Sequence, residues 1–404
     1  MDIGFIFFGI PLRIGEVVFF LSILRIINSK EAVTVKKVNK IGLLILIFML
    51  FNFLLVIGSN LFNNLFTLFT FKYLLRNFIY FFLLFSFLIK PIEYSLIKVN
   101  SFIKYIIYLV FVFFVIELVD FYIISFNWDN LFFVKRQGKS IFKDFIIKFS
   151  GQASEPAYIV PLLSISLMYG LFKKKFNYSI ISAFFILMTF SSFGYAVILF
   201  AIFFFFMKVE DNRIRKKVEN FLIKMFSIFT IIGLIFFNKT IDVLEHNLIK
   251  FQAFFGFGNA VEWSANQRTG HSMLALKLFS DSKWYQMIFG SGTGYYDIMS
   301  KQFKGYYLDD AEEAHNLYLS TLLDRGIIGL LFIISIFYLI SKIRIPNTEN
   351  NDFEYFFMAL KFGVYVRIFH WIFTGMFWQY YFWVEIVLLL SAKTYFLNKK
   401  HEIR

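Results

Sequence analysis

Apolar runs of about twenty residues recur through this chain, and they constrain its fold more than any other feature. A membrane-spanning helix needs roughly 20 consecutive, mostly apolar residues. We predict about eleven spans (ten to twelve), at residues 5–27, 41–58, 65–89, 102–125, 156–172, 176–191, 193–209, 221–238, 316–341, 355–375 and 377–397. The chain is 59% hydrophobic and only 17% charged, more apolar than a soluble fold can hide. The sequence therefore predicts an all-α, polytopic integral membrane protein, with residues 1–404 as a single membrane domain.

Basic residues fall in every second connector between these spans. The basic connectors carry Lys30, Lys36, Lys37 and Lys40; Lys90, Lys98 and Lys104; Lys173, Lys174 and Lys175; Arg213, Arg215, Lys216 and Lys217; Lys342 and Arg344; and Lys399, Lys400 and Arg404. By the positive-inside rule, these connectors and the C-terminus lie in the cytoplasm, which places the N-terminus outside. The same rule accounts for the net charge of +14 without a nucleic-acid partner.

The start of the chain is the least regular of the predicted spans. The first 30 residues lack the basic start and the small-residue cleavage site of a signal peptide, so we expect this segment to remain. Pro11, Arg13 and Glu16 interrupt it, and a re-entrant start fits these residues as well. The chain contains no cysteine, so neither disulfides nor thiolate metal sites contribute.

Two predicted outer loops depart from the charge alternation. They are a basic loop at residues 126–155 and a long loop at residues 239–314. Long loops cross the membrane regardless of charge, and this suffices for the second loop. It is a weaker account of the first, which carries Lys135, Arg136, Lys139, Lys143 and Lys148. An anionic ligand at the outer leaflet is the alternative explanation for these cations.

A histidine stands at the mouth of one predicted span, in the run "DDAEEAHNLYLSTLLDRGIIGLL" (309–331). Asp310 and Glu313 have the spacing of a capping box, and a helix that starts there places His315 in its second turn. An interfacial histidine that is hydrogen-bonded to water or to lipid headgroups would fit the same pattern. A catalytic histidine at the membrane surface is the alternative.

The same run carries charges and glycines inside the predicted span. Asp324 and Arg325 lie at a depth where charges are costly unless they are paired or face the bundle interior. Gly326 and Gly329 are three residues apart, a spacing that lets a neighbouring backbone approach closely. Both features are compatible with a purely structural role.

Three further groups on the outer side are candidates for contact with an anionic substrate. Arg268 precedes an apolar run that we expect to form an amphipathic helix, and "GSGTGYY" (290–296) has glycine at alternate positions, including Gly292 and Gly294. Glycine-rich backbone can wrap an anion with its N–H groups, and it can equally be a plain loop. Glu155 ends the basic loop before a span, where a carboxylate can also stabilise a helix N-terminus.

Several familiar kinds of site are missing from the sequence. It has no HExxH motif, no His/Cys cluster with metal-ligand spacing, no GxSxG motif and no outer D-x-D pair. We therefore expect catalysis without a metal, a cofactor or a nucleotide donor. Arg367 and His370 lie in or near a span, where ionisable groups are functional candidates.

The run "AHNLYLSTLLDRGIIGLL" (314–331) closely resembles the signature of the O-antigen polymerase and O-antigen ligase superfamily. The order of other features also fits: Glu155 and Pro156 before a span, a Ser-rich turn at 190–194, Arg268 before an amphipathic segment, and "FGSGTGYY" before His315. The resemblance covers residues 126–341. Many members of the family have an arginine in the Ser-rich turn, whereas Phe193 stands there in this chain, which puts a cationic role of the turn in doubt. Arg136 or Lys135 would be alternative sources of that charge.

The resemblance implies a membrane glycosyltransferase whose donor is an oligosaccharide on undecaprenyl pyrophosphate. His315 would be the general base, because a neutral imidazole can take the proton of the attacking sugar hydroxyl. Arg268 and Arg136 would bind the pyrophosphate, together with Gly292 and Gly294. Asn316 would orient His315 or the sugar, and Glu155 would complete the substrate-binding residues.

A polymerase of surface polysaccharide, such as O-antigen or capsule, is the first prediction. A ligase that moves the finished glycan to another acceptor is the alternative within the family, and a flippase for lipid-linked sugars is the alternative of another class. We expect a multi-pass protein of the cytoplasmic (inner) membrane, with its active site on the extracytoplasmic face. Its partners would be the lipid-linked substrate, the membrane and a chain-length regulator protein.

Overall fold

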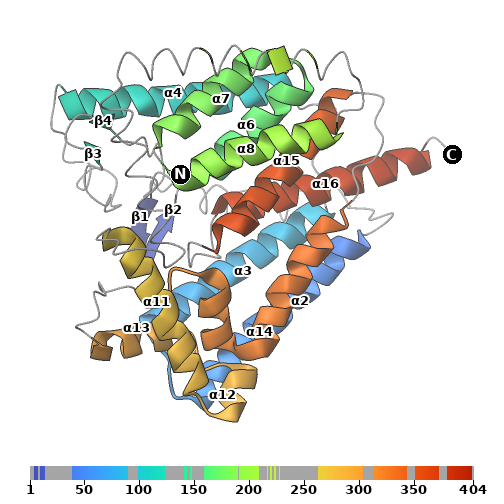
Figure 1. Cartoon of the computed structure of the whole chain (residues 1–404). Coiled ribbons are helices and arrows are strands. Elements are labelled where there is room, and N and C mark those ends of the chain that lie inside the picture. The colour runs from blue at the N-terminus through green and yellow to red at the C-terminus, as the bar shows by residue number, and fades with distance from the viewer. Residues whose placement is uncertain are drawn as a thin grey trace.

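A computed structural model describes residues 4–7, 10–13, 39–89, 99–122, 141–142, 146–147, 159–189, 191–208, 263–303, 314–343, 351–372 and 380–402, with five single positions between 216 and 227. This part of the chain is mainly helical (Figure 1). Its helices are α2 (Lys40–Phe62), α3 (Leu68–Ile89), α4 (Val99–Tyr122), α6 (Val160–Phe172), α7 (Phe176–Met188), α8 (Ser192–Lys208), α11 (Trp263–Ser280), α12 (Trp284–Phe289), α13 (Tyr295–Ser300), η3 (Lys301–Phe303), α14 (Leu317–Ser341), α15 (Asn351–His370) and α16 (Tyr380–Glu402).

Two short antiparallel strand pairs accompany the helices. Strand β1 (Gly4–Phe7) pairs with β2 (Ile10–Arg13), and β3 (Ile141–Phe142) pairs with β4 (Ile146–Ile147). The prediction of a helical span from residue 5 is therefore wrong for its first residues. Pro11 fits a strand here because its missing N–H group removes a helix bond, and a two-stranded pair has an open edge.

Nine of the predicted spans coincide with helices among the described residues. In the part of the chain that the structure describes, four helical segments are long and apolar enough to cross a membrane, namely 40–62, 70–89, 99–116 and 317–341. Helices α6, α7 and α8 are apolar but shorter. The predicted span 221–238 lies almost wholly outside the described residues, and the count of about eleven spans stays a prediction.

The helices form two packed groups that share α16. In one group α2 packs on α3 and α14, and in the other α6 packs on α7, α8 and α15. Helix α16 contacts α3 in the first group and α15 in the second. The short helices α12 and α13 gather with α11 around the N-terminal half of α14, at one end of the molecule (Figure 1). This end holds the candidate site.

Small residues let these helices approach one another closely. A Cβ atom at Gly42 would overlap the Leu88 side chain of α3, and one at Gly363 would overlap Ile165 of α6. The buried hydroxyls of Ser166 and Ser182 lie 2.6 Å apart where α6 meets α7. Close backbone approach and hydrogen bonds between helices are the usual means of packing inside lipid, where no hydrophobic force draws helices together.

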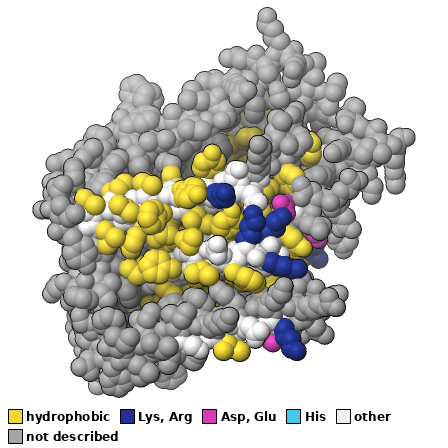
Figure 2. All heavy atoms as spheres, turned by 90° about the horizontal axis from the view of Figure 1, so that it is seen from above, with side chains coloured by type: hydrophobic (Ala, Val, Ile, Leu, Met, Phe, Trp, Pro, Cys, Tyr) yellow, Lys and Arg dark blue, Asp and Glu magenta, His cyan; other side chains and the backbone are white. Residues whose placement is uncertain are grey.

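The outer surface of the bundle is apolar, as expected of a protein surrounded by lipid. The face that carries α4 and α7 shows a broad band of hydrophobic side chains, with Lys and Arg gathered at one end (Figure 2). Exposed apolar side chains of this region include Phe111, Phe184 and Phe203. The elements of this region carry Lys104 in α4, and Lys173, Lys174 and Lys175 between α6 and α7. A cationic rim beside an apolar band is the pattern that the positive-inside rule predicts.

Candidate functional site

Helix α14 begins at Leu317, and Asn316 caps it. The Asn316 Oδ1 atom accepts hydrogen bonds from the N–H groups of Tyr318 (3.0 Å) and Leu319 (3.1 Å). This arrangement satisfies two N–H groups that have no acceptor within the helix. The expectation that a helix from Asp310 would hold His315 in its second turn is wrong, because the cap places His315 two residues ahead of the helix.

The backbone of His315 is in the left-handed region, with φ at 49°. A residue with a side chain is uncommon there, and such conformations persist where the surroundings fix them, often at functional sites. Two hydrogen bonds fix this one. The Ala314 N–H group donates to Ser320 Oγ (3.2 Å), and the Leu317 N–H group donates to the Trp371 carbonyl oxygen (3.0 Å). The side chain of His315 is half-buried.

A second histidine, His271 of α11, lies against the first. The two ring centroids are 4.9 Å apart, and the ring planes meet at 65°. His271 is fully buried, and its Nδ1 atom lies 2.6 Å from Tyr296 Oη of α13. Burial raises the pKa of Tyr296 well above its usual value. His271 was not predicted as a site residue, although it stands one helical turn after Arg268 in the segment expected to be amphipathic.

The glycine-rich loop after α12 packs on a break in α14. Gly326 has φ 65° and ψ −169°, which interrupts the helix. The N–H groups of Ser291 and Gly292 donate to the carbonyl oxygens of Leu323 (2.9 Å) and Asp324 (3.0 Å). In an unbroken helix these carbonyls would accept from the N–H groups four residues later. The loop therefore replaces hydrogen bonds that the break removes.

The connection between α2 and α3 holds the same loop from its other side. Thr293 donates its N–H group to Asn60 Oδ1 (3.0 Å), and its carbonyl oxygen accepts from Asn60 Nδ2 (3.1 Å) and Thr70 Oγ1 (3.0 Å). Asn63 Nδ2 donates to the Gly290 carbonyl oxygen (3.3 Å). The loop thus connects the adjacent ends of α2 and α3 to α14, the helix that follows His315.

These bonds bear on the predicted substrate contacts of Gly292 and Gly294. The N–H group of Gly292 is already used by the Asp324 carbonyl, and both glycines are buried with positive φ values of 101° and 94°. The positive φ values, which residues with a side chain rarely adopt, explain the glycines at both positions. Contact of the two glycines with substrate stays a prediction. Their structural role is to allow the left-handed backbone of this loop.

The structure places the other predicted site residues as follows. Arg268 lies within α11, in its second turn, rather than ahead of an amphipathic helix as expected. Its side chain lies outside the described part of the structure. Arg136 and Glu155 also lie outside the described residues. Binding of the pyrophosphate by Arg268 and Arg136 therefore stays a prediction.

Asp324 and Arg325 do not form an ion pair with each other among the described residues. Arg325 donates from Nη1 to Asn52 Oδ1 (2.9 Å) and from Nη2 to Thr321 Oγ1 (2.8 Å), and its guanidinium lies 5.2 Å from the centre of the Tyr73 ring. A buried cation is stabilised here by amide, hydroxyl and aromatic groups. This contact ties α14 to α2 and α3.

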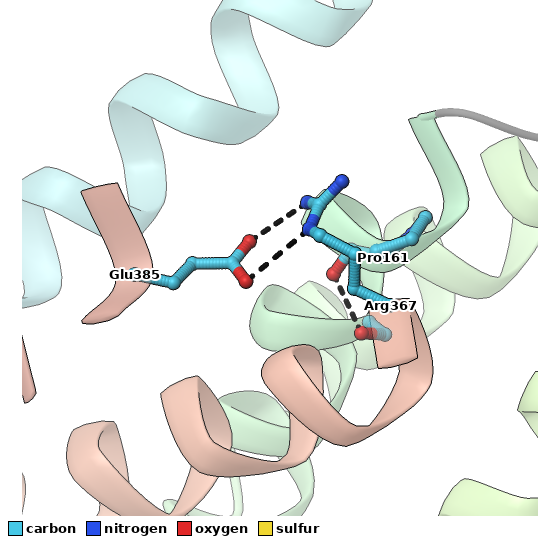
Figure 3. A network of polar contacts seen from close by, with 4 residues as sticks. Pro161, Arg367 and Glu385 are labelled. Carbon is cyan, nitrogen blue, oxygen red and sulfur yellow. Dashed lines mark hydrogen bonds and ion pairs between the residues drawn. The ribbon is translucent and has the colours of Figure 1, made fainter. Parts of the chain in front are cut away.

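A buried ion pair joins Arg367 of α15 to Glu385 of α16. Arg367 Nη2 lies 2.8 Å from Glu385 Oε1, and Nε lies 3.4 Å from Oε2, with both side chains buried. The two point toward one another beside Pro161 of α6 (Figure 3). Arg367 was predicted from the sequence as a functional candidate, whereas its partner Glu385 was not. His370 instead lies against Phe193, with ring centroids 4.5 Å apart.

Comparison with known proteins gives a family match for part of the chain. Residues 178–334 match the O-antigen ligase family. The resemblance predicted from the "AHN" run is thereby confirmed. The O-antigen ligase segment extends from α7 to α14 and contains His271, Tyr296 and His315. No curated protein matches the chain. The apolar helices and the family match together indicate a membrane protein, and the O-antigen ligase family is a glycosyltransferase-like class of enzymes.

No group of three or more His, Cys, Asp or Glu residues within the described part of the chain could hold a metal ion. The expectation of metal-free chemistry stays a prediction.

Proposed function

We propose that this protein joins lipid-linked oligosaccharide repeat units into a surface polysaccharide, such as an O-antigen or a capsule. The donor would be a repeat-unit glycan on undecaprenyl pyrophosphate, and the reaction would take place at the outer face of the cytoplasmic membrane. The observation that carries the proposal is a histidine in a left-handed backbone conformation, His315, just before a helix that is long and apolar enough to cross a membrane, within the O-antigen ligase segment.

The position of His315 suits chemistry between a lipid in the bilayer and a sugar in water. The acceptor hydroxyl attacks the anomeric carbon, and a neutral imidazole takes the hydroxyl proton. The pyrophosphate leaves with the electron pair of the broken bond. Arg268, one helical turn from His271 on α11, would stabilise the negative charge of the leaving group.

Asn316 has a defined structural task in this proposal. Its Oδ1 atom is used by two backbone N–H groups, so it supports His315 by fixing the start of α14. The predicted role of Asn316 in orienting the imidazole or the sugar stays a prediction beside this support.

A ligase reaction is the second candidate, because the family match is to O-antigen ligase. A ligase would use the same base and donor, with a different acceptor. A flippase for lipid-linked sugars requires neither His315 nor a proton acceptor at the membrane surface. The three functions therefore predict different products in the host.

The test compares lipid-linked glycans on gels from the wild-type host, a deletion strain, and the deletion strain complemented with His315→Ala at equal expression. If the protein is a polymerase, single repeat units remain on the outer leaflet in both the deletion strain and the His315→Ala strain. If it is a ligase, both strains accumulate long chains on the lipid that are not transferred to an acceptor. Repeat units that accumulate facing the cytoplasm indicate a flippase, and a full ladder with His315→Ala removes the base assignment.

A further inference from the structure

One face of α2 is apolar and exposed along the whole length of the helix. Its exposed apolar side chains are Leu43, Leu44, Ile47, Leu50, Phe51, Leu54, Leu61 and Phe62. They recur every three or four residues, which is the spacing of a single helix face. Gly58 continues this face, and a Cβ atom added there would meet no atom within 4 Å. Because α2 is long and apolar enough to cross a membrane, lipid is the natural surrounding of this face.

The end of this face marks the outer edge of the hydrocarbon. Lys36, Lys37 and Lys40 stand at the start of α2, and the positive-inside rule predicts that this start is cytoplasmic. The helix has 23 residues. At 1.5 Å per residue it covers about 35 Å, slightly more than the hydrocarbon core of about 30 Å. Phe62, the last residue of α2, is 72% exposed and therefore lies where the hydrocarbon meets the outer headgroups.

The short helix α12 is held against this end of α2. The ring centroids of Phe62 and Tyr285 are 5.3 Å apart, with the edge of one ring toward the face of the other. Gln286 Nε2 donates a hydrogen bond to Asn63 Oδ1 (2.9 Å). Helix α12 lies at the same end of the molecule as α11 and α13 (Figure 1). These contacts place α12 at the level of Phe62.

The exposed side chains of α12 and its N-cap suit that level. Trp284 is 72% exposed, and its ring lies 5.9 Å from the ring of Tyr285. Lys283 is exposed, and its ammonium lies 6.0 Å from the centre of the Tyr285 ring. Tryptophan and tyrosine are enriched where a bilayer meets water. A lysine beside them can lay its apolar stem along the rings and direct its charge to a phosphate.

We propose that α12 is an anchor in the headgroup region of the outer leaflet. The Trp284 indole lies among the lipid headgroups, and the Lys283 ammonium lies at a lipid phosphate. The lipid surface is the partner because α12 continues the lipid-facing side of α2 and adds a cation where anionic phosphates are found. The inference goes beyond the proposed function and does not depend on glycosyl transfer.

The anchor has a consequence for the candidate site. Helix α12 leads directly into the glycine-rich loop, where the N–H groups of Ser291 and Gly292 bond the carbonyl oxygens of Leu323 and Asp324 beside the break in α14. His315 directly precedes the same helix. An anchored α12 therefore fixes the depth of α14, and with it that of His315, relative to the headgroups.

The experiment measures the depth of single spin labels in the full-length protein. The chain contains no cysteine, so each single-cysteine variant carries one nitroxide label. The variants are Trp284→Cys and Phe289→Cys in α12, and Leu54→Cys as the matched control on the apolar face of α2. All three side chains are exposed, so the substitutions leave the packing of the bundle intact. In liposomes of phosphatidylethanolamine and phosphatidylglycerol, collisions with oxygen and with a water-soluble nickel chelate report depth. Lipids labelled at the headgroup and in mid-chain calibrate it.

We expect the ratio of oxygen to nickel collisions for the two α12 labels to lie between those of headgroup-labelled lipid and mid-chain-labelled lipid. The Leu54→Cys label should match the mid-chain lipid. If Trp284→Cys does not fold, Phe289→Cys decides by the same criterion.

Three results would overturn the inference. If the α12 labels collide with nickel as often as a free label in water does, α12 lies in water. Labels that are shielded from both reagents would mean that protein covers α12, and magnetic coupling between labels would identify a second copy of the chain as that cover. A Leu54→Cys label in water would remove the lipid-facing side of α2 on which the level of α12 depends.

Discussion

At the scale of single residues, the start of α14 separates a capping task from a chemical one. Asn316 supplies the side-chain oxygen that caps the N-terminus of α14. His315, one residue earlier, has a left-handed backbone, and its ring lies against that of His271. The Ala314 and Leu317 N–H groups anchor the two sides of this short segment. The position of the imidazole therefore depends on its neighbours in the chain.

Substitution of Asn316 separates capping from substrate binding. Asn316→Ala removes the cap, and we expect it to lower stability by about 1 kcal/mol and to reduce activity. Asn316→Ser keeps a capping oxygen and should restore both. Thermal unfolding in detergent and the rate of chain formation are the two measurements. A serine variant with normal stability and no activity would show that Asn316 contacts substrate.

At the scale of elements, the break in α14 lies where helices α11, α12 and α13 pack on α14. A Cβ atom at Gly326 would overlap the Ile288 carbonyl group, and one at Gly290 would overlap the Asp324 carbonyl oxygen. Both glycines also have positive φ. Glycine at these two positions is thus required by close approach and by backbone conformation together.

Substitution of Gly326 tests this joint against a matched glycine. We expect Gly326→Ala to destabilise the protein by about 2 kcal/mol or more, through strain at positive φ and overlap with the loop. Gly58→Ala in α2 is the control, because no atom lies within 4 Å of the added Cβ, and alanine favours a helix by about 0.5–1 kcal/mol. Melting temperatures of the two variants should move in opposite directions. An unchanged melting temperature for Gly326→Ala would mean that the loop is not held by the break.

The elements were predictable from the sequence to the extent that their signals are local. Helices α2, α3 and α14 follow from continuous apolar runs, and the close approach at Gly326 follows from its spacing with Gly329. The break at Gly326 was not predictable, because the compensating hydrogen bonds come from Ser291 and Gly292, in a separate segment. The short strands near Pro11 were not predicted either, because a short apolar run fits a strand as well as the start of a membrane span.

At the scale of the whole molecule, contacts between distant segments bring the site together. His271 and His315 are brought together by the packing of α11 on α14, and Arg367 meets Glu385 through the packing of α15 on α16. No local pattern pairs such residues, so the "AHN" run pointed to His315 but not to its neighbour. The apolar outer face and its basic end agree with the charge alternation read from the connectors (Figure 2).

The role of His315 is tested by chain formation with the purified protein in liposomes that contain only lipid-linked saccharides from the deletion strain. We expect a ladder of longer lipid-linked chains with the wild type. Formation with His315→Ala should be at least a hundredfold slower, since a positioned base contributes about 10²–10⁴ in rate, at an unchanged melting temperature. A ladder formed at the wild-type rate by His315→Ala would contradict the claim that this histidine takes the proton in the transfer.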